Sequence, residues 1–169
     1  MNRRLLLTLC CLGAVLSAPA LRAGESLYDP SSAQPLTESQ RAFFGKRSGQ
    51  FKYDRRMIRA AEIAAARAGA QSTSRCWHYV KDALLEAGVV SQRPTTAWAK
   101  QAGDELCHKF GFRRLHIRSP WDAPVGSVIV YGGHDAGHVE LRTESGFASD
   151  FVSRTPYPRP LIGVYVKTS

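Results

Sequence analysis

The spacing of hydrophobic residues changes from a helical period to a strand period near residue 112. Before that point, apolar residues recur every three or four positions, which predicts three helices, at 55–68, 75–87 and 95–111. Glycine follows or ends each of these segments, as is typical of helix C-termini. After that point, apolar and polar residues alternate, which predicts strands separated by turn residues, at 112–117, 128–131, 138–142, 147–151 and 161–166. Helices followed by antiparallel strands predict an α+β fold in which N-terminal helices pack on a C-terminal sheet.

The N-terminal region has the pattern of a secretory signal. Two arginines precede an apolar run at 5–16, and small residues follow it up to Ala23. The run is shorter than the roughly 20 residues of a spanning helix, so we expect cleavage after Ala23 and no membrane anchor. Residues 24–53 are rich in Ser, Pro, Gly and charge, which is typical of a leader of low order. The sequence thus predicts an exported protein, periplasmic or secreted, with one domain at 54–169.

The formal charge of the whole chain is +9, and it falls to +6 when residues 1–23 are removed, because they contain three arginines and no acid. A basic surface attracts anionic partners such as nucleic acid, acidic lipid or carboxylate-rich cell wall. The sequence has no zinc-finger spacing, Gly-rich phosphate loop or aromatic RNA-binding motif. These absences argue against a nucleic-acid partner.

Two cysteines, Cys76 and Cys107, remain after the predicted signal. In an oxidising compartment they favour a disulfide, and a Cys76–Cys107 bridge would indicate a non-catalytic exported domain that binds wall or a protein. The position of Cys76 argues against this alternative. Cys76 lies in the first turn of the 75–87 helix, where free backbone N–H groups and the positive helix end stabilise a thiolate. The pattern therefore predicts a nucleophile, which needs a base to exchange its proton.

His138 is the candidate base. It opens the 138–142 strand, in which Val139 and Leu141 alternate with His138 and Glu140. A base at the end of a rigid strand, facing the start of a helix, suits a Cys–His pair. We therefore expect the 75–87 helix to pack on the sheet face that carries His138.

The imidazole of His138 also needs a polar partner that fixes its tautomer. Asp150 on the next strand would supply it if the loop near 143–146 holds an odd number of residues, and Gly146 fits a three-residue hairpin loop. An even loop would turn Asp150 to the other face of the sheet. Glu140 is then the candidate third residue.

Three segments resemble, in the same order, the CHAP amidase family and its NlpC-type relatives: Cys76-Trp-His-Tyr-Val, Pro124-Val-Gly-Ser-Val-Ile-Val-Tyr and Gly137-His-Val-Glu-Leu. The resemblance covers about 55–166. It implies a papain-like fold and hydrolysis of a peptidoglycan amide through an acyl-enzyme, with no metal or other cofactor. It also implies that Cys76 is the nucleophile, His138 the base and Asp150 the third residue. It leaves the scissile bond open between the muramoyl–L-alanine amide and a bond of the stem peptide.

The residue before the nucleophile is often Gln in CHAP members, whereas this chain has Arg75. The backbone N–H of Cys76 is therefore the surer oxyanion donor, and Gln71 is a candidate second donor. Trp77 is expected either to line a substrate groove or to pack in the core.

A zinc site is the remaining alternative for the histidines. His134 and His138 have a ligand-like spacing, which Cys107 and His108 would complete. The His134-Asp-Ala-Gly segment is typical of a turn rather than a helix. The spacing of His134 and His138 therefore does not indicate a pair of metal ligands, and we expect no metal site.

Overall fold

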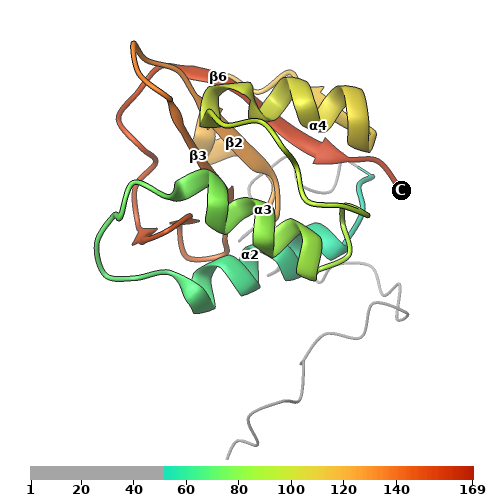
Figure 1. The fold of residues 1–169 in the computed structure, drawn as a ribbon, viewed down its shortest axis with the longest axis horizontal. Helices are drawn as coiled ribbons and strands as arrows, with labels where there is room; N and C mark the ends of the chain where they lie inside the picture. The colour runs from blue at the N-terminus through green and yellow to red at the C-terminus, as the bar shows by residue number, and fades with distance from the viewer. Residues whose placement is uncertain (1–51) are drawn as a thin grey trace, which may run out of the picture.

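The computed structural model describes residues 52–169, so the predicted signal at 1–23 and nearly all of the predicted leader at 24–53 lie outside the described residues. Its helices are α2 (Arg56–Arg67), α3 (Cys76–Glu86) and α4 (Ala102–Phe110), and a 3-10 turn, η2 (Ala99–Gln101), leads into α4. Figure 1 shows α2 and α3 next to each other beside β3, with α4 near β6. None of the helices in this part of the chain is long and apolar enough to cross a membrane.

Six strands form a single sheet, whose pairings are all antiparallel, in the order β1-β6-β2-β3-β4-β5. The strands are β1 (Phe112–Leu115), β2 (Val128–Tyr131), β3 (His138–Arg142), β4 (Phe147–Ala148), β5 (Val152–Ser153) and β6 (Leu161–Lys167). A second 3-10 turn, η3 (Pro120–Asp122), follows β1. The predicted α+β class is confirmed, with the helices before the sheet in the chain and packed on it.

The two faces of the sheet carry separate hydrophobic clusters. The larger cluster joins all three helices to one face, which includes Val139 and Leu141 of β3. The smaller cluster lies on the other face and includes Ile129 and Tyr131 of β2, which pair with Glu140 and His138. Helix α3 therefore packs on the face opposite His138, and the prediction that both lie on the same face was wrong.

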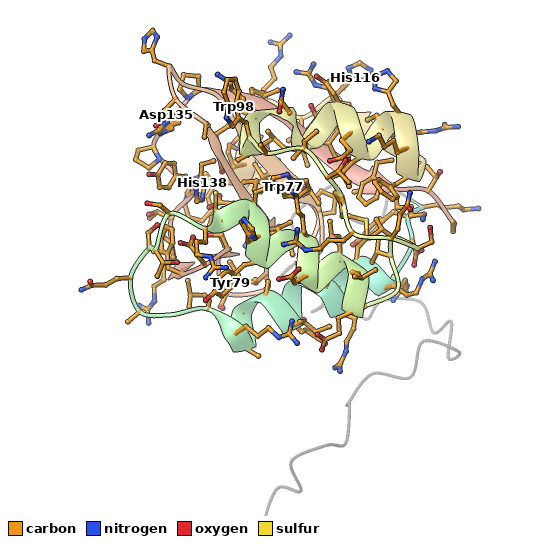
Figure 2. All side chains as sticks on the ribbon, viewed as in Figure 1. Trp77, Tyr79, Trp98, His116, Asp135 and His138 are labelled. Atoms are coloured by element: carbon orange, nitrogen blue, oxygen red, sulfur yellow. The ribbon has the colours of Figure 1, made fainter. Side chains whose placement is uncertain are left out.

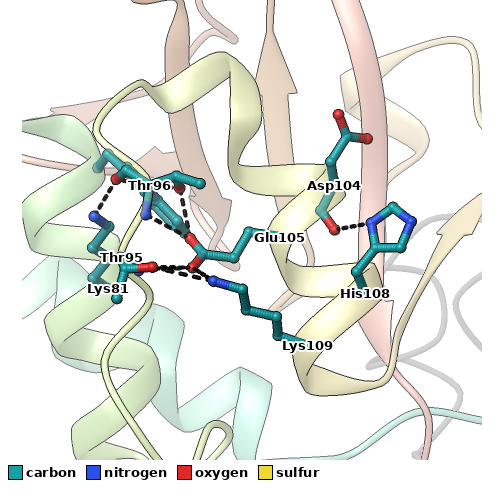
Figure 3. Close-up of polar contacts among 8 residues, drawn as sticks. Lys81, Thr95, Thr96, Asp104, Glu105, His108 and Lys109 are labelled. Atoms are coloured by element: carbon teal, nitrogen blue, oxygen red, sulfur yellow. Dashed lines mark hydrogen bonds and ion pairs between the residues drawn. The ribbon is translucent and has the colours of Figure 1, made fainter.

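The third predicted helix begins later than expected. Thr95 and Thr96, placed in that helix by the sequence pattern, donate their backbone N–H groups and their hydroxyls to the buried carboxylate of Glu105 (Figure 3). These bonds hold 95–96 in a loop beside α3, where Lys81 Nζ donates to the Thr96 carbonyl. Trp98 lies within the predicted helix at 95–111, but in the structure it precedes η2 and is 51% exposed.

The predicted strand at 147–151 is also shorter in the structure. It ends at Ala148, and the chain turns through Ser149 and Asp150 before β5 runs back along β4. Arg142 pairs with Phe147 across β3 and β4, so the four residues 143–146 connect the two strands. This even number contradicts the predicted odd loop, and it places Asp150 beyond the end of β4 rather than opposite His138.

Candidate active site

Cys76 and His138 each stand at the first residue of their element, α3 and β3. Although α3 packs on the other sheet face, the first residue of the strand lies near the start of the helix, and the Cys76 thiol is close enough to His138 to raise the pKa of its imidazole. Figure 2 shows His138 near the N-terminal end of α3. Both side chains are buried, with Cys76 9% exposed. The structure thus brings the two predicted residues together.

Glu140 lies at the remote side of the His138 ring. Its Oε2 is 3.5 Å from His138 Nε2, which is longer than an ordinary hydrogen bond, and Nε2 has no hydrogen-bond partner within residues 52–169. The other carboxylate oxygen, Oε1, accepts a hydrogen bond from the hydroxyl of Tyr131. Burial and the neighbouring carboxylate raise the pKa of Tyr131 well above its usual value, so the phenol stays protonated and donates.

Tyr157 covers a face of the imidazole. The two rings are stacked, with centroids 3.9 Å apart and planes at 19°, and the backbone N–H of Tyr157 is 3.5 Å from Glu140 Oε1. An ion pair between Arg159 and Asp135 connects the Tyr157 loop to the turn that precedes His138. The loop therefore holds the imidazole from the side away from the helix.

The protonation of His138 depends on these neighbours. Burial alone lowers the pKa of the imidazole, but the interactions with Cys76 and then with Glu140 outweigh it and raise the pKa to about 9. The site thus favours an imidazolium at neutral pH.

Asp150 occupies a different place from the one predicted. Its Oδ2 accepts hydrogen bonds from the backbone N–H groups of Thr73 and Arg75 and from the hydroxyls of Ser72 and Thr73, all of which precede α3. No hydrogen bond or ion pair joins Asp150 to His138 in the described part of the chain. The even β3–β4 connection explains the difference, and Glu140, the alternative from the sequence, lies at the imidazole instead.

The remaining candidates are dispersed. Trp77 is 3% exposed and donates its indole N–H to Thr96, so it packs in the core, the second of the two expected placements. Gln71 lies exposed in the segment before α3. Cys76 and Cys107 are free thiols, which removes the disulfide on which the non-catalytic alternative rested. Within residues 52–169, the structure has no cluster of three His, Cys, Asp or Glu side chains that could hold a metal.

Sequence reasoning missed Tyr131 and Tyr157. Tyr131 carried a usable signal, because it ends the strand that pairs with His138. Tyr157 lies in a Pro-Tyr-Pro segment of a loop, and nothing in its local sequence indicates the stacking on His138.

Comparisons with known proteins place this chain in a family. No protein-family model matches the chain, CHAP and NlpC-type models included, and the comparison with curated proteins gives no match. Two solved chains match, from native and selenomethionine crystal structures of the type VI effector–immunity complex Tae3–Tai3 from Ralstonia pickettii. The first is 30% identical with a TM-score of 0.55, and the match covers 70% of this chain and 100% of that chain. The second is 34% identical with a TM-score of 0.49, and the match covers 64% of this chain and 97% of that chain.

The helices, the antiparallel sheet and the first of these solved chains define an α+β protein of the papain-like class. Within that class, the chain belongs to the family of the type VI effector Tae3.

Proposed function

We propose that this protein is a cysteine hydrolase in which Cys76 is the nucleophile, His138 the general acid and base, and Glu140 the residue that orients the imidazole. The observation that carries the proposal is the proximity of the Cys76 thiol to His138, which raises the pKa of the imidazole, while Glu140 lies at Nε2 of the same ring. With Nε2 turned to the carboxylate, Nδ1 is the nitrogen available to the sulfur. A nucleophile, a base and an orienting group in this order form the arrangement of a catalytic triad.

In the proposed reaction, the Cys76 thiolate attacks the carbonyl carbon of an amide, a C–S bond forms, and the oxygen takes the negative charge. The backbone N–H of Cys76 is the proposed donor to this oxyanion. Collapse of the intermediate breaks the C–N bond as the His138 imidazolium gives its proton to the leaving amine. A water molecule, deprotonated by His138, then hydrolyses the thioester and releases the acid and the free enzyme.

The proposed substrate is the amide-linked peptide of bacterial peptidoglycan. Two arguments support it. The order of the motifs around Cys76, Pro124 and His138 resembles CHAP and NlpC-type enzymes, for which peptidoglycan is the expected substrate. The Tae3 relative forms an effector–immunity complex, and an effector that requires an immunity protein acts on a target that the producing cell also contains, as its own wall would be. Export through the segment at 1–23 would bring the enzyme to that polymer.

Digestion of purified sacculi tests the proposal. Wild-type protein should release soluble muropeptides, whose masses identify the bond cleaved, and Cys76→Ala and His138→Ala should release none. Release by Cys76→Ala at a rate near that of the wild type would disprove the cysteine mechanism.

A further inference from the structure

We propose that Asp150 is a positioning residue for the nucleophile: it fixes the segment before α3, and thereby the direction of the Cys76 thiol and backbone N–H. This inference rests on the proposed role of Cys76. It differs from the triad role that the sequence suggested, because Asp150 acts on the cysteine side of the site and through the backbone.

The contacts of Asp150 are concentrated on the approach to Cys76. Its Oδ2 lies 2.6 Å from the N–H nitrogen of Thr73 and 3.1 Å from that of Arg75. The hydroxyls of Thr73 and Ser72 donate to the same oxygen, at 3.0 and 3.2 Å. Oδ1 accepts from the hydroxyl of Ser149, and the main-chain carbonyl of Asp150 accepts from the Gly69 N–H. A single residue thus holds the segment at several points between Gly69 and the start of α3.

The segment itself has little else to define it. Residues 69–75 are exposed, whereas Asp150 is 0% exposed. Ser74 has a φ of 61°, a left-handed conformation that a residue with a Cβ adopts at a cost and only where its surroundings impose it. The two backbone donors to Asp150, on Thr73 and Arg75, flank this residue. The N–H of Ser74 itself donates to the Ser72 hydroxyl, which in turn donates to Asp150, so the carboxylate supports the strained turn both directly and through Ser72.

The consequence for Cys76 follows from how helices begin. The first hydrogen bond inside α3 runs from the Tyr79 N–H to the Arg75 carbonyl, so the N–H groups of Cys76, Trp77 and His78 have no partner within the helix. Asp150 occupies the N–H of Arg75, immediately before them, and within residues 52–169 no acceptor binds the N–H of Cys76. The carboxylate thus fixes the peptide next to Cys76 and leaves the Cys76 N–H free for an oxyanion. Hydrogen bonds from Arg75 and Thr73 outweigh burial and lower the pKa of Asp150, so the carboxylate stays charged at neutral pH.

The alkylation rate of Cys76 tests this role without a substrate. Iodoacetamide labelling of the folded protein, followed by mass spectrometry of the Cys76 peptide, separates this thiol from Cys107. We expect Asp150→Ala to slow labelling at pH 7 by about tenfold or more, because the thiol loses its alignment with His138. Asp150→Asn keeps an oxygen that accepts the same backbone donors, as Asn does at other helix starts, and should stay within about threefold of the wild type.

Asp54→Ala is the matched control, since the Asp54 carboxylate binds the Arg56 N–H at the start of α2, on another helix. It should leave the labelling of Cys76 within about twofold, whatever it does to thermal stability. A wild-type rate of Cys76 labelling in a folded Asp150→Ala protein would overturn the inference. An equal decrease of the labelling rate in Asp150→Ala and Asp150→Asn would also overturn it.

If Asp150→Ala does not fold, the double variant Ser72→Ala/Thr73→Val decides the question, because both side chains are exposed and supply two of the four donors to Oδ2. Labelling about threefold slower supports the inference, and an unchanged rate overturns it. If the wild type releases no muropeptides while the labelling follows these expectations, the positioning role stands and the proposed hydrolase activity fails.

Discussion

Neutralising Glu140 is the most direct test of how the imidazole is controlled. Glu140→Gln keeps the size of the side chain and an oxygen that can accept from Tyr131, but it removes the negative charge 3.5 Å from His138 Nε2. The pKa of His138 is about 9, compared with 6.5 for an ordinary histidine, and Cys76 contributes more to this rise than Glu140 does. If the variant lowers the pKa from about 9 to about 8, the imidazolium loses about 1.4 kcal/mol of stabilisation.

The assay is the pH dependence of kcat/KM for muropeptide release. Because loss of the imidazolium limits activity at high pH, the alkaline limb of the profile should move about one pH unit lower in Glu140→Gln. Glu144→Gln is the matched control, since Glu144 is an exposed carboxylate just after β3, and its profile should coincide with that of the wild type. An alkaline limb that is the same in Glu140→Gln and the wild type would refute the claim that Glu140 acts on His138.

Tyr157 at the site, the buried Glu105 and the exposed arginines near β1 each give a further prediction. Tyr157→Leu should lower kcat/KM by about threefold to tenfold with little change in Tm, because it removes the ring stacked on His138, and full activity would contradict this. Glu105→Gln should lower the free energy of unfolding in urea by about 1–3 kcal/mol at pH 7, because Glu105 is buried and accepts five hydrogen bonds, four from Thr95 and Thr96 and one from Lys109. The pKa of Glu105 is lowered from 4.5 to about 2, so the stability that it adds is present above pH 4.5 and is lost as the pH falls to 2. If the free energy of unfolding of Glu105→Gln decreases as steeply with acid as that of the wild type, this role of Glu105 is contradicted. Arg113 and Arg118 are exposed on and just after the edge strand β1. Neutralising both should reduce co-sedimentation of the protein with sacculi at low salt. Binding to sacculi that does not change with salt would exclude charge as the cause.

The sequence predicted those elements whose boundaries depend on local patterns. The strands at 128–131 and 138–142 have the predicted bounds, and α2 and α3 agree to within one residue at each end. Gly88 and Gly111 follow α3 and α4 in left-handed conformations, with φ of 67° and 71°, as helix-ending glycines do. Helical and strand periods are local properties, so the first residues of α3 and β3, and with them Cys76 and His138, could be located from the sequence alone.

The predictions that were wrong concern features determined by residues far apart in the sequence. Thr95 and Thr96 fit a helix pattern, but the carboxylate of Glu105 binds their N–H groups, and only the folded chain brings the three together. The parity of the β3–β4 connection decided whether Asp150 or Glu140 would meet the imidazole, and the position of Gly146 fitted a shorter loop than the one that formed. A one-residue change in such a connection moves every following side chain to the opposite face.

The placement of the two halves of the site on opposite faces of the sheet has a consequence for inactivation. Cys76 belongs to the cluster that joins the three helices to the sheet, whereas the paired strands place His138 and Glu140 on the face of the smaller cluster. Among residues 52–169, the smaller cluster has six buried members and the larger has 24, so less hydrophobic burial surrounds the base than surrounds the nucleophile. Partial opening of the weaker layer would separate imidazole from sulfur while the helical layer stays folded. If the proposed mechanism holds, such a local event would abolish activity before the domain as a whole denatures.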